Sequence, residues 1–165
     1  MESKLGPSEE ADYIKALNYS FLLLRYRLRS KNEMISRLKK KKYGSAVIKR
    51  IVRYLSQYNY INDKEFCRVF IESGLQKGWG PRKIDFNLAK LGVDVRLRSE
   101  MLGRGVDYSF QIQRLIDKKD ASLGPVKDKI AAKKKLQKIL RYLLNRGFSY
   151  QDIMKEMEGR KIINI

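Results

Sequence analysis

A short pattern that occurs three times constrains the fold of this chain more than any other feature. In each copy, a residue that favours the start of a helix is followed four and eight positions later by apolar residues. The copies are Ser30, Met34 and Leu38; Gly80, Ile84 and Leu88; and Ser149, Ile153 and Met157. An amphipathic segment precedes each copy. Repeated helical units bury their cores partly against one another, so the pattern predicts a tandem array of small helical bundles.

The first repeat is predicted to span residues 8–61 as three helices. Apolar residues at spacings of three and four form the inner stripe of its first helix: Ile14, Leu17, Phe21, Leu24 and Leu28. Ser30 and Glu33 have the spacing of a capping box, which predicts that the second helix begins there. A third helix would turn Ile48, Ile51, Val52 and Leu55 inward.

The rest of the chain is predicted to follow the same plan with one interruption. A second three-helix repeat occupies residues 62–102, where Pro81 is the residue type favoured at the first position of a helix. Residues 103–124 are the least periodic part, and we expect a linker there with a short helix from Tyr108 to Lys118. A third repeat occupies residues 125–165. Strand signals are nearly absent, so the predicted fold class is all-α.

Positive charge is abundant and unevenly distributed. The chain has 37 lysines and arginines against 18 acidic residues, a formal net charge of +19. Residues 25–53 carry +11 and residues 127–146 carry +7, whereas residues 63–102 carry only +2. Such an excess favours an anionic partner, with nucleic acid as the first candidate and an anionic membrane as a weaker one. No apolar run approaches the length of a membrane span.

Two clusters of cations are the predicted contacts to nucleic-acid phosphates. The first consists of Arg25, Arg29, Lys39, Lys40, Lys41, Lys42, Lys49, Arg50 and Arg53. The second consists of Lys133, Lys134, Lys135, Lys138 and Arg141. For the four consecutive lysines alone, the alternative is a solvated helix end that complements the helix dipole. The wider first cluster favours phosphate contact, because its charge exceeds what solubility requires.

An aromatic residue between two glycines, Trp79, is a candidate for base stacking. The alternative is a ring that folds over its own turn and packs on the second repeat. Tyrosines also surround the first basic cluster, and we expect most of them to pack between helices with the hydroxyl at the surface.

The residue types present in the chain give little support for a catalytic function. The chain has no histidine, which removes the commonest general base and most zinc sites. Its one cysteine, Cys67, lies between Phe66 and Val69 and is expected to be a buried, inert thiol in a reducing cytoplasm. Acidic residues are scattered, with no spacing that would converge on a metal. We therefore predict no enzyme activity, no catalytic residue, no metal and no cofactor.

Three stretches, at residues 27–38, 60–93 and 143–153, carry the motifs of a known family. The most specific begins with Tyr60-Ile61-Asn62-Asp63, continues with Gly78-Trp79-Gly80-Pro81-Arg82-Lys83-Ile84 and closes on Leu91-Gly92-Val93. In their order and spacing the three stretches resemble RecX, the bacterial regulator of the RecA recombinase. One departure is Lys42, which stands before Tyr43 where the family commonly has glycine.

The resemblance implies an elongated, curved array of three-helix repeats that binds along the RecA–DNA filament and inhibits ATP hydrolysis and strand exchange. It also implies a role in homologous recombination, DNA repair and the SOS response. The expected partners are the RecA filament and single- and double-stranded DNA, for a cytoplasmic monomer without membrane association. Trp79, Arg82 and Lys83 are the candidate partner-binding or stacking residues. Two alternatives remain open: a nucleic-acid-binding protein without a protein partner, and a structural scaffold whose charge is incidental.

Overall fold

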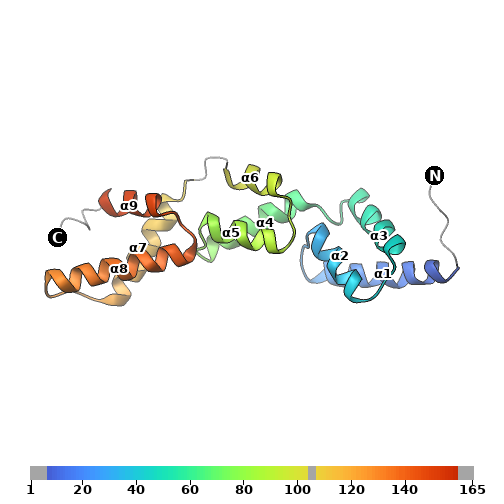
Figure 1. Ribbon diagram of the computed structural model, residues 1–165, viewed down its shortest axis with the longest axis horizontal. Helices are drawn as coiled ribbons and strands as arrows, with labels where there is room; N and C mark the ends of the chain where they lie inside the picture. The colour runs from blue at the N-terminus through green and yellow to red at the C-terminus, as the bar shows by residue number, and fades with distance from the viewer. Residues whose placement is uncertain (1–6, 104–106, 160–165) are drawn as a thin grey trace. The chain divides into compact units, whose positions relative to one another are not determined.

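The computed structural model describes residues 7–103 and 107–159, which form nine α-helices and no strand (Figure 1). The helices are α1 (Pro7–Tyr26), α2 (Lys31–Lys40), α3 (Ser45–Gln57), α4 (Asp63–Gln76), α5 (Pro81–Lys90), α6 (Val95–Gly103), α7 (Ser109–Leu123), α8 (Lys129–Arg146) and α9 (Tyr150–Gly159). The all-α fold class is confirmed. The last six residues of the predicted third repeat lie outside the described residues. No helix in the described ranges is long and apolar enough to cross a membrane.

The repeated pattern marks the starts of α2, α5 and α9. In each copy the carbonyl of the first residue accepts a hydrogen bond from the amide four residues later. The distances are 3.0 Å from Met34 to Ser30, 3.1 Å from Ile84 to Gly80 and 3.1 Å from Ile153 to Ser149. All six apolar members of the pattern are buried, with none more than 3% exposed. Each copy therefore opens a helix and sets the face that this helix turns to a core.

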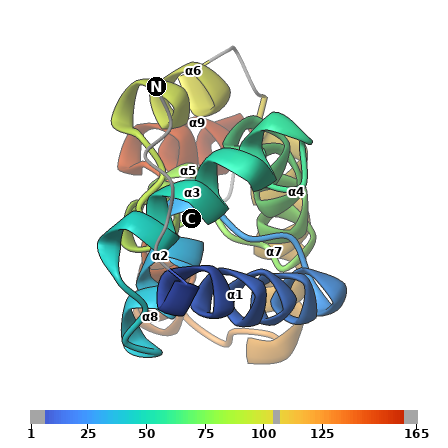
Figure 2. The same cartoon turned by 90° about the vertical axis from the view of Figure 1, so that its right-hand side faces the viewer.

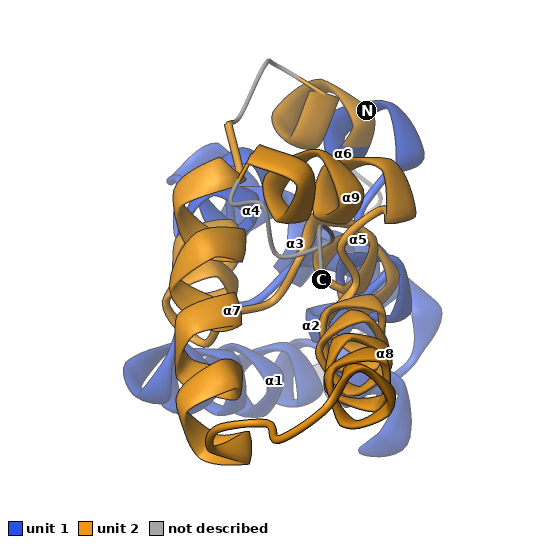
Figure 3. Cartoon of the chain, turned by 90° about the vertical axis from the view of Figure 1, so that its left-hand side faces the viewer, with its two compact units in different colours: residues 1–69, 88–98 blue, residues 70–87, 99–165 orange. Residues whose placement is uncertain are grey.

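The chain divides into two compact units, residues 1–69 with 88–98 and residues 70–87 with 99–165 (Figure 3). The three helices α4, α5 and α6 are each divided between the two units.

In the first unit, α1, α2 and α3 lie against one another (Figure 2). Their shared core includes Met34, Leu38 and Ile51. The predicted inner stripe of α1 is partly wrong, because Ile14 and Leu28 are 56% and 43% exposed. Small residues face the core instead. Ala16 and Ser20 are fully buried, and the Ser20 hydroxyl donates to the Ala16 carbonyl at 2.7 Å. That bond satisfies the hydroxyl, so a serine can occupy this position without an unpaired polar group.

In the second unit, α7, α8 and α9 share a core with Phe148 at the turn between α8 and α9. Residues 109–123, predicted as part of a linker with a short helix from Tyr108 to Lys118, are helical throughout and bury Ile112, Leu115 and Ile116 in this core. The third bundle therefore begins before residue 125. Only three residues of α7 are buried, at spacings of three and one. So few positions do not distinguish a helix from a linker by sequence pattern alone.

Hydrogen bonds tie the helix starts to segments that are distant in sequence. In the first unit, the Ser30 hydroxyl donates to the Leu91 carbonyl at 2.6 Å, and the Lys31 amide donates to the Asp63 carboxylate at 2.7 Å. In the second unit, the Gly80 amide donates to the Arg146 carbonyl at 2.7 Å. A Cβ added at Gly80 would lie 2.5 Å from backbone atoms of Gly147 and Phe148. Gly80 has no side chain because another backbone segment lies against it.

Replacing Gly80 by alanine is expected to lower the free energy of unfolding by about 1–3 kcal/mol, the usual cost of forcing atoms into filled space. Gly159→Ala is the matched control, because a Cβ there meets nothing within 4 Å. Its effect should stay within about 0.5 kcal/mol. Urea denaturation of both variants measures the difference. Equal stability of the two variants would contradict the close backbone contact.

The turn after α2 shows how the chain accommodates a lysine where a glycine is expected. Lys42 has a φ of +63°, in the left-handed region, and Gly92 at the end of α5 has a φ of +72°. Both residues lie twelve positions after the first residue of their copies. The backbone turn is therefore the same in both places, and Lys42 adopts it against the steric preference of a residue with a Cβ.

Replacing Lys42 by glycine is expected to raise the free energy of unfolding by about 1 kcal/mol, because a non-glycine residue in the left-handed region is disfavoured by roughly that amount. Lys41→Gly removes the same charge at a residue with a φ of −83°, so it should destabilise. Thermal unfolding of the pair separates backbone conformation from charge. Reduced stability of both variants would contradict the assignment.

Candidate nucleic-acid interface

The consecutive lysines at the end of α2 are exposed, as a phosphate-binding surface requires. Lys39 and Lys40 form the last turn of the helix, and Lys41 and Lys42 follow it. Their positive charge lies beside the carbonyl end of the helix, where the dipole favours cations. The Lys41 ammonium also lies 5.3 Å from the centre of the Tyr19 ring. Arg25, in the last turn of α1, is exposed as well.

Arg29 is not part of that surface. Its side chain is only 8% exposed, and it pairs with Glu33, which also accepts from Arg27. The Arg29 Nε donates to the Leu23 carbonyl at 3.3 Å. The expected capping box is confirmed in one direction, since the Glu33 amide donates to the Ser30 hydroxyl at 3.0 Å. The Glu33 carboxylate pairs with both Arg27 and Arg29. The pairing with Glu33 holds the buried Arg29 side chain inside the first unit, away from a phosphate at the surface.

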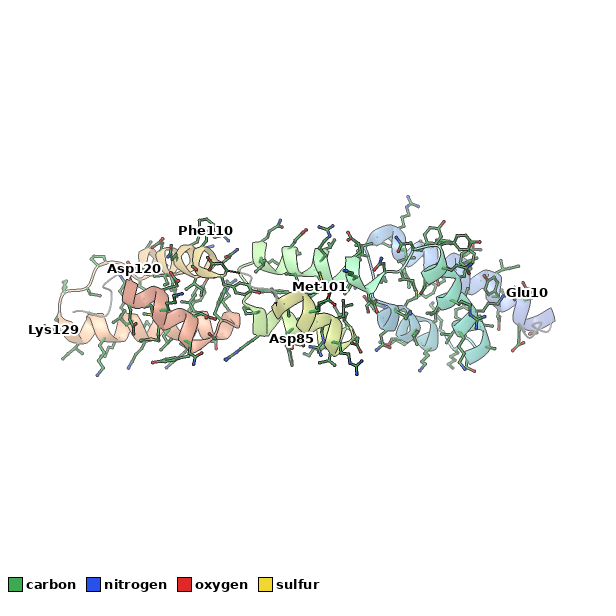
Figure 4. All side chains as sticks on the ribbon, turned by 90° about the horizontal axis from the view of Figure 1, so that it is seen from above. Glu10, Asp85, Met101, Phe110, Asp120 and Lys129 are labelled. Atoms are coloured by element: carbon green, nitrogen blue, oxygen red, sulfur yellow. The ribbon has the colours of Figure 1, made fainter. Side chains whose placement is uncertain are left out.

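Arg50 is also held within the first unit. It pairs with Glu10, labelled in Figure 4, at 2.9 Å, and its guanidinium lies 4.4 Å from the centre of the Tyr13 ring. Both contacts join α3 to α1. A phosphate would have to compete with this carboxylate, so Arg50 contributes less to an anion site than the exposed lysines.

Three of the predicted cations lie together with one that the sequence analysis missed. Lys39, Lys49 and Arg53 line a groove between α2 and α3, and Lys31 completes its cationic edge. Lys31, Ile35 and Lys39 follow one another at intervals of four, which places them on one face of α2. That spacing was the signal in the sequence that could have identified Lys31.

In the second unit, α8 presents a stripe of cations opposite its core face. Lys134, Lys138 and Arg141 are exposed and lie on one side of the helix, whereas Ile139 and Leu143 are buried on the other. Lys133 is exposed beside the stripe.

Lys135 departs from the prediction, because its ammonium bonds Asp120 of α7 (Figure 4) and the Gly124 carbonyl, both at 2.7 Å. It lies nearer the core face of α8 and closes the third bundle.

Trp79 packs against side chains near its own turn, in agreement with the alternative prediction. The ring is half-buried, with its centre 6.2 Å from that of Phe70. The ammonium groups of Lys77 and Lys83 lie 5.2 Å and 5.6 Å from the ring centre. Arg82 is exposed nearby, and its amide donates to the Gly147 carbonyl. This arrangement attaches two cations to an aromatic ring and leaves part of the ring accessible.

The tyrosines near the first cluster are divided between packed and exposed rings. The rings of Tyr54 and Tyr58 lie 4.7 Å apart, and that of Tyr60 meets Phe21 edge-on at 4.9 Å. Tyr26 is 77% exposed and lies at the end of α1 next to Arg25. Tyr58 and Tyr60 are 59% and 47% exposed despite their ring contacts. Tyr26, Tyr58 and Tyr60 therefore do not follow the expectation of packing between helices.

The cysteine and the acidic side chains are the residues to consider for reactive or metal-binding chemistry. Cys67 is fully buried, as expected. Within residues 7–103 and 107–159 there is no group of three or more cysteine, aspartate or glutamate side chains placed to hold a metal ion. What the surface offers is exposed positive charge on α2, α3 and α8.

Arg29→Met is expected to lower the free energy of unfolding by about 1–3 kcal/mol, because it leaves Glu33 and the Leu23 carbonyl without a buried partner. The matched control is Lys49→Met, which removes the same charge from an exposed site and should change stability by less than about 0.5 kcal/mol. For binding to single-stranded DNA we expect the opposite: Lys49→Met lowers the salt dependence of the affinity, and Arg29→Met leaves it unchanged. Urea denaturation and a salt titration measure the two properties. A stable Arg29→Met protein would contradict the structural role.

Comparison with known proteins identifies relatives over most of the chain. Residues 16–55 match the first three-helix domain of RecX, and residues 62–102 match the second. The regulatory protein RecX of Finegoldia magna is 25% identical over 146 residues, which cover 88% of this chain and 71% of that protein. That of Bacillus licheniformis is 29% identical over 159 residues, covering 96% of this chain and 58% of that protein.

A solved structure agrees with these matches. The crystal structure of RecX from Lactobacillus salivarius superposes with a TM-score of 0.78 at 25% identity, covering 94% of this chain and 99% of that one. Two domain matches in the expected order, relatives across most of the chain and the shared fold lead to one conclusion: the chain belongs to the RecX family.

Proposed function

We propose that this protein binds the RecA–DNA filament and inhibits ATP hydrolysis and strand exchange by the recombinase. Its relatives are regulatory proteins, which supports a regulatory role. The observation that carries the DNA-binding part is the exposed stripe of Lys134, Lys138 and Arg141 on α8.

The length of the stripe suits a nucleic-acid backbone. Seven residues of helix cover about 10 Å, a distance over which one strand of a duplex presents about three phosphates. The lysines at the end of α2 supply a second exposed group on the first unit. Contacts of this kind bind without reading sequence, which suits a protein that follows a filament on any DNA.

Inhibition would follow from a difference in affinity between filament states. A protein that contacts DNA phosphates and recombinase subunits together stabilises the state in which both are in reach. If that state hydrolyses ATP slowly, its population rises as the regulator binds. The chain needs no catalytic group of its own for this effect, and the action would take place in the cytoplasm.

The DNA-binding part is tested with Lys134→Gln, Lys138→Gln and Arg141→Gln combined. On single strands the log–log salt slope should fall by about 2, or about 0.7 for each phosphate that the variant no longer neutralises. The matched control combines Lys64→Gln, Arg96→Gln and Lys118→Gln, which removes the same charge from exposed sites outside the stripe. Equal slopes for both triple variants would show that net charge alone drives binding.

DNA-stimulated ATP hydrolysis by the recombinase tests the regulatory part, with this protein added in amounts too small to coat the DNA. A fall in the rate supports regulation of the filament. An unchanged rate, together with normal single-strand binding, would favour the rival function, a nucleic-acid-binding protein without a protein partner. The triple α8 variant should inhibit less than the matched control.

A further inference from the structure

The groove between α2 and α3 has both an apolar floor and cationic edges. Phosphate binding requires only the cations. The groove has a volume of about 990 Å³. Its floor is formed by Ile35, Tyr43, Ile48 and Val52. Its edges carry Lys31, Lys39, Lys49 and Arg53. An apolar floor between cationic edges is suited to a partner that is apolar on one side and acidic on the other.

The nature of the floor argues against nucleic acid as the occupant. Bases stack on aromatic planes, and three of the four floor residues are aliphatic. Tyr43 is half-buried and packs against the core of the first unit. Aliphatic side chains instead favour the burial of apolar side chains from another protein. The cationic edges then select carboxylates on the same partner.

We propose that this groove binds an acidic amphipathic helix of a protein partner. Helices that bind in this way insert apolar residues at spacings of three and four and leave their polar residues at the edges. The ten residues of α2 set the length of the site. At 1.5 Å per residue they span about 15 Å, which accommodates about three turns of a bound helix.

The inference goes beyond the proposed function, because exposed cations suffice for phosphate contact without any apolar floor. The two can therefore fail separately. Single-strand binding is measured in parallel with peptide binding on the full chain, so that a defect in one activity is distinguished from a defect in both.

The probe is a fluorescein-labelled synthetic peptide with leucines at helical spacing on one face and glutamates on the other. A scrambled peptide of the same composition is the matched ligand, since it keeps the charge and has no apolar face. Fluorescence anisotropy should show the amphipathic peptide binding about tenfold more tightly than the scrambled one, the factor expected from a few buried apolar anchors. Equal affinities would overturn the proposal.

The matched protein variant combines Ile35→Gln and Val52→Gln, which replaces half-buried floor residues without changing net charge. It should weaken peptide binding about tenfold and leave single-strand binding within about twofold. Unchanged peptide binding would overturn the proposal. An equal fall in oligonucleotide binding would also overturn it and would make the groove a nucleic-acid site.

A second variant tests the groove without replacing a half-buried residue, so its result does not depend on whether the first variant folds. Lys31→Glu changes only an exposed edge residue that belongs to neither predicted phosphate cluster. It should weaken binding of the amphipathic peptide while the thermal unfolding temperature stays close to that of the parent. Retention of full peptide affinity would contradict the cationic edge as a determinant.

Discussion

The close approach of backbone segments at helix starts is the constraint on which the other features depend. Gly80 lies against Gly147 so closely that a single added carbon would meet backbone atoms at 2.5 Å. The Ser30 hydroxyl reaches the Leu91 carbonyl in the first unit in a similar way. Each contact fixes where a helix begins and which residues it turns inward.

Cations in this protein are divided between those that hold the fold together and those left at the surface. Arg29 and Lys135 bond carboxylates and backbone carbonyls inside their own units. Lys134, Lys138 and Arg141 face away from the core of the third bundle. Net charge counts both kinds alike, although only the second kind can release counterions on binding. The surface proposed to bind phosphates is therefore smaller and better defined than the charge excess suggests.

Two surfaces of different chemistry result from this division. The α8 stripe is purely cationic, which suits a repeating anionic backbone. The α2–α3 groove adds an aliphatic floor to its cationic edge, which suits an amphipathic protein segment. A regulator of a protein–DNA filament needs to contact both components. The proposals assign DNA contact to α8 and the end of α2, and protein contact to the apolar floor of the groove, whose edge shares Lys39 with the α2 lysines.

Much of the fold could be predicted from the sequence, because burial at helical spacing leaves a strong local signal. The three copies of the pattern placed the starts of α2, α5 and α9, and their six apolar residues are buried. The resemblance to RecX also rested on local motifs. The full length of α7 was not predicted, because only three of its residues are buried and so few positions do not define a helical period. Their burial becomes evident only where α8 and α9 pack against them.

What the sequence determined by itself is the class of helix-rich repeat, the family and the excess of positive charge. Only the tertiary structure decided which cations are available and which residues form the groove. Arg29 and Lys49 are equally basic in the sequence, but Arg29 meets Glu33 in the interior and Lys49 lines an open groove. The reason is physical: helical spacing is a local property of the chain, whereas the partner of a charge is set by segments that folding brings beside it.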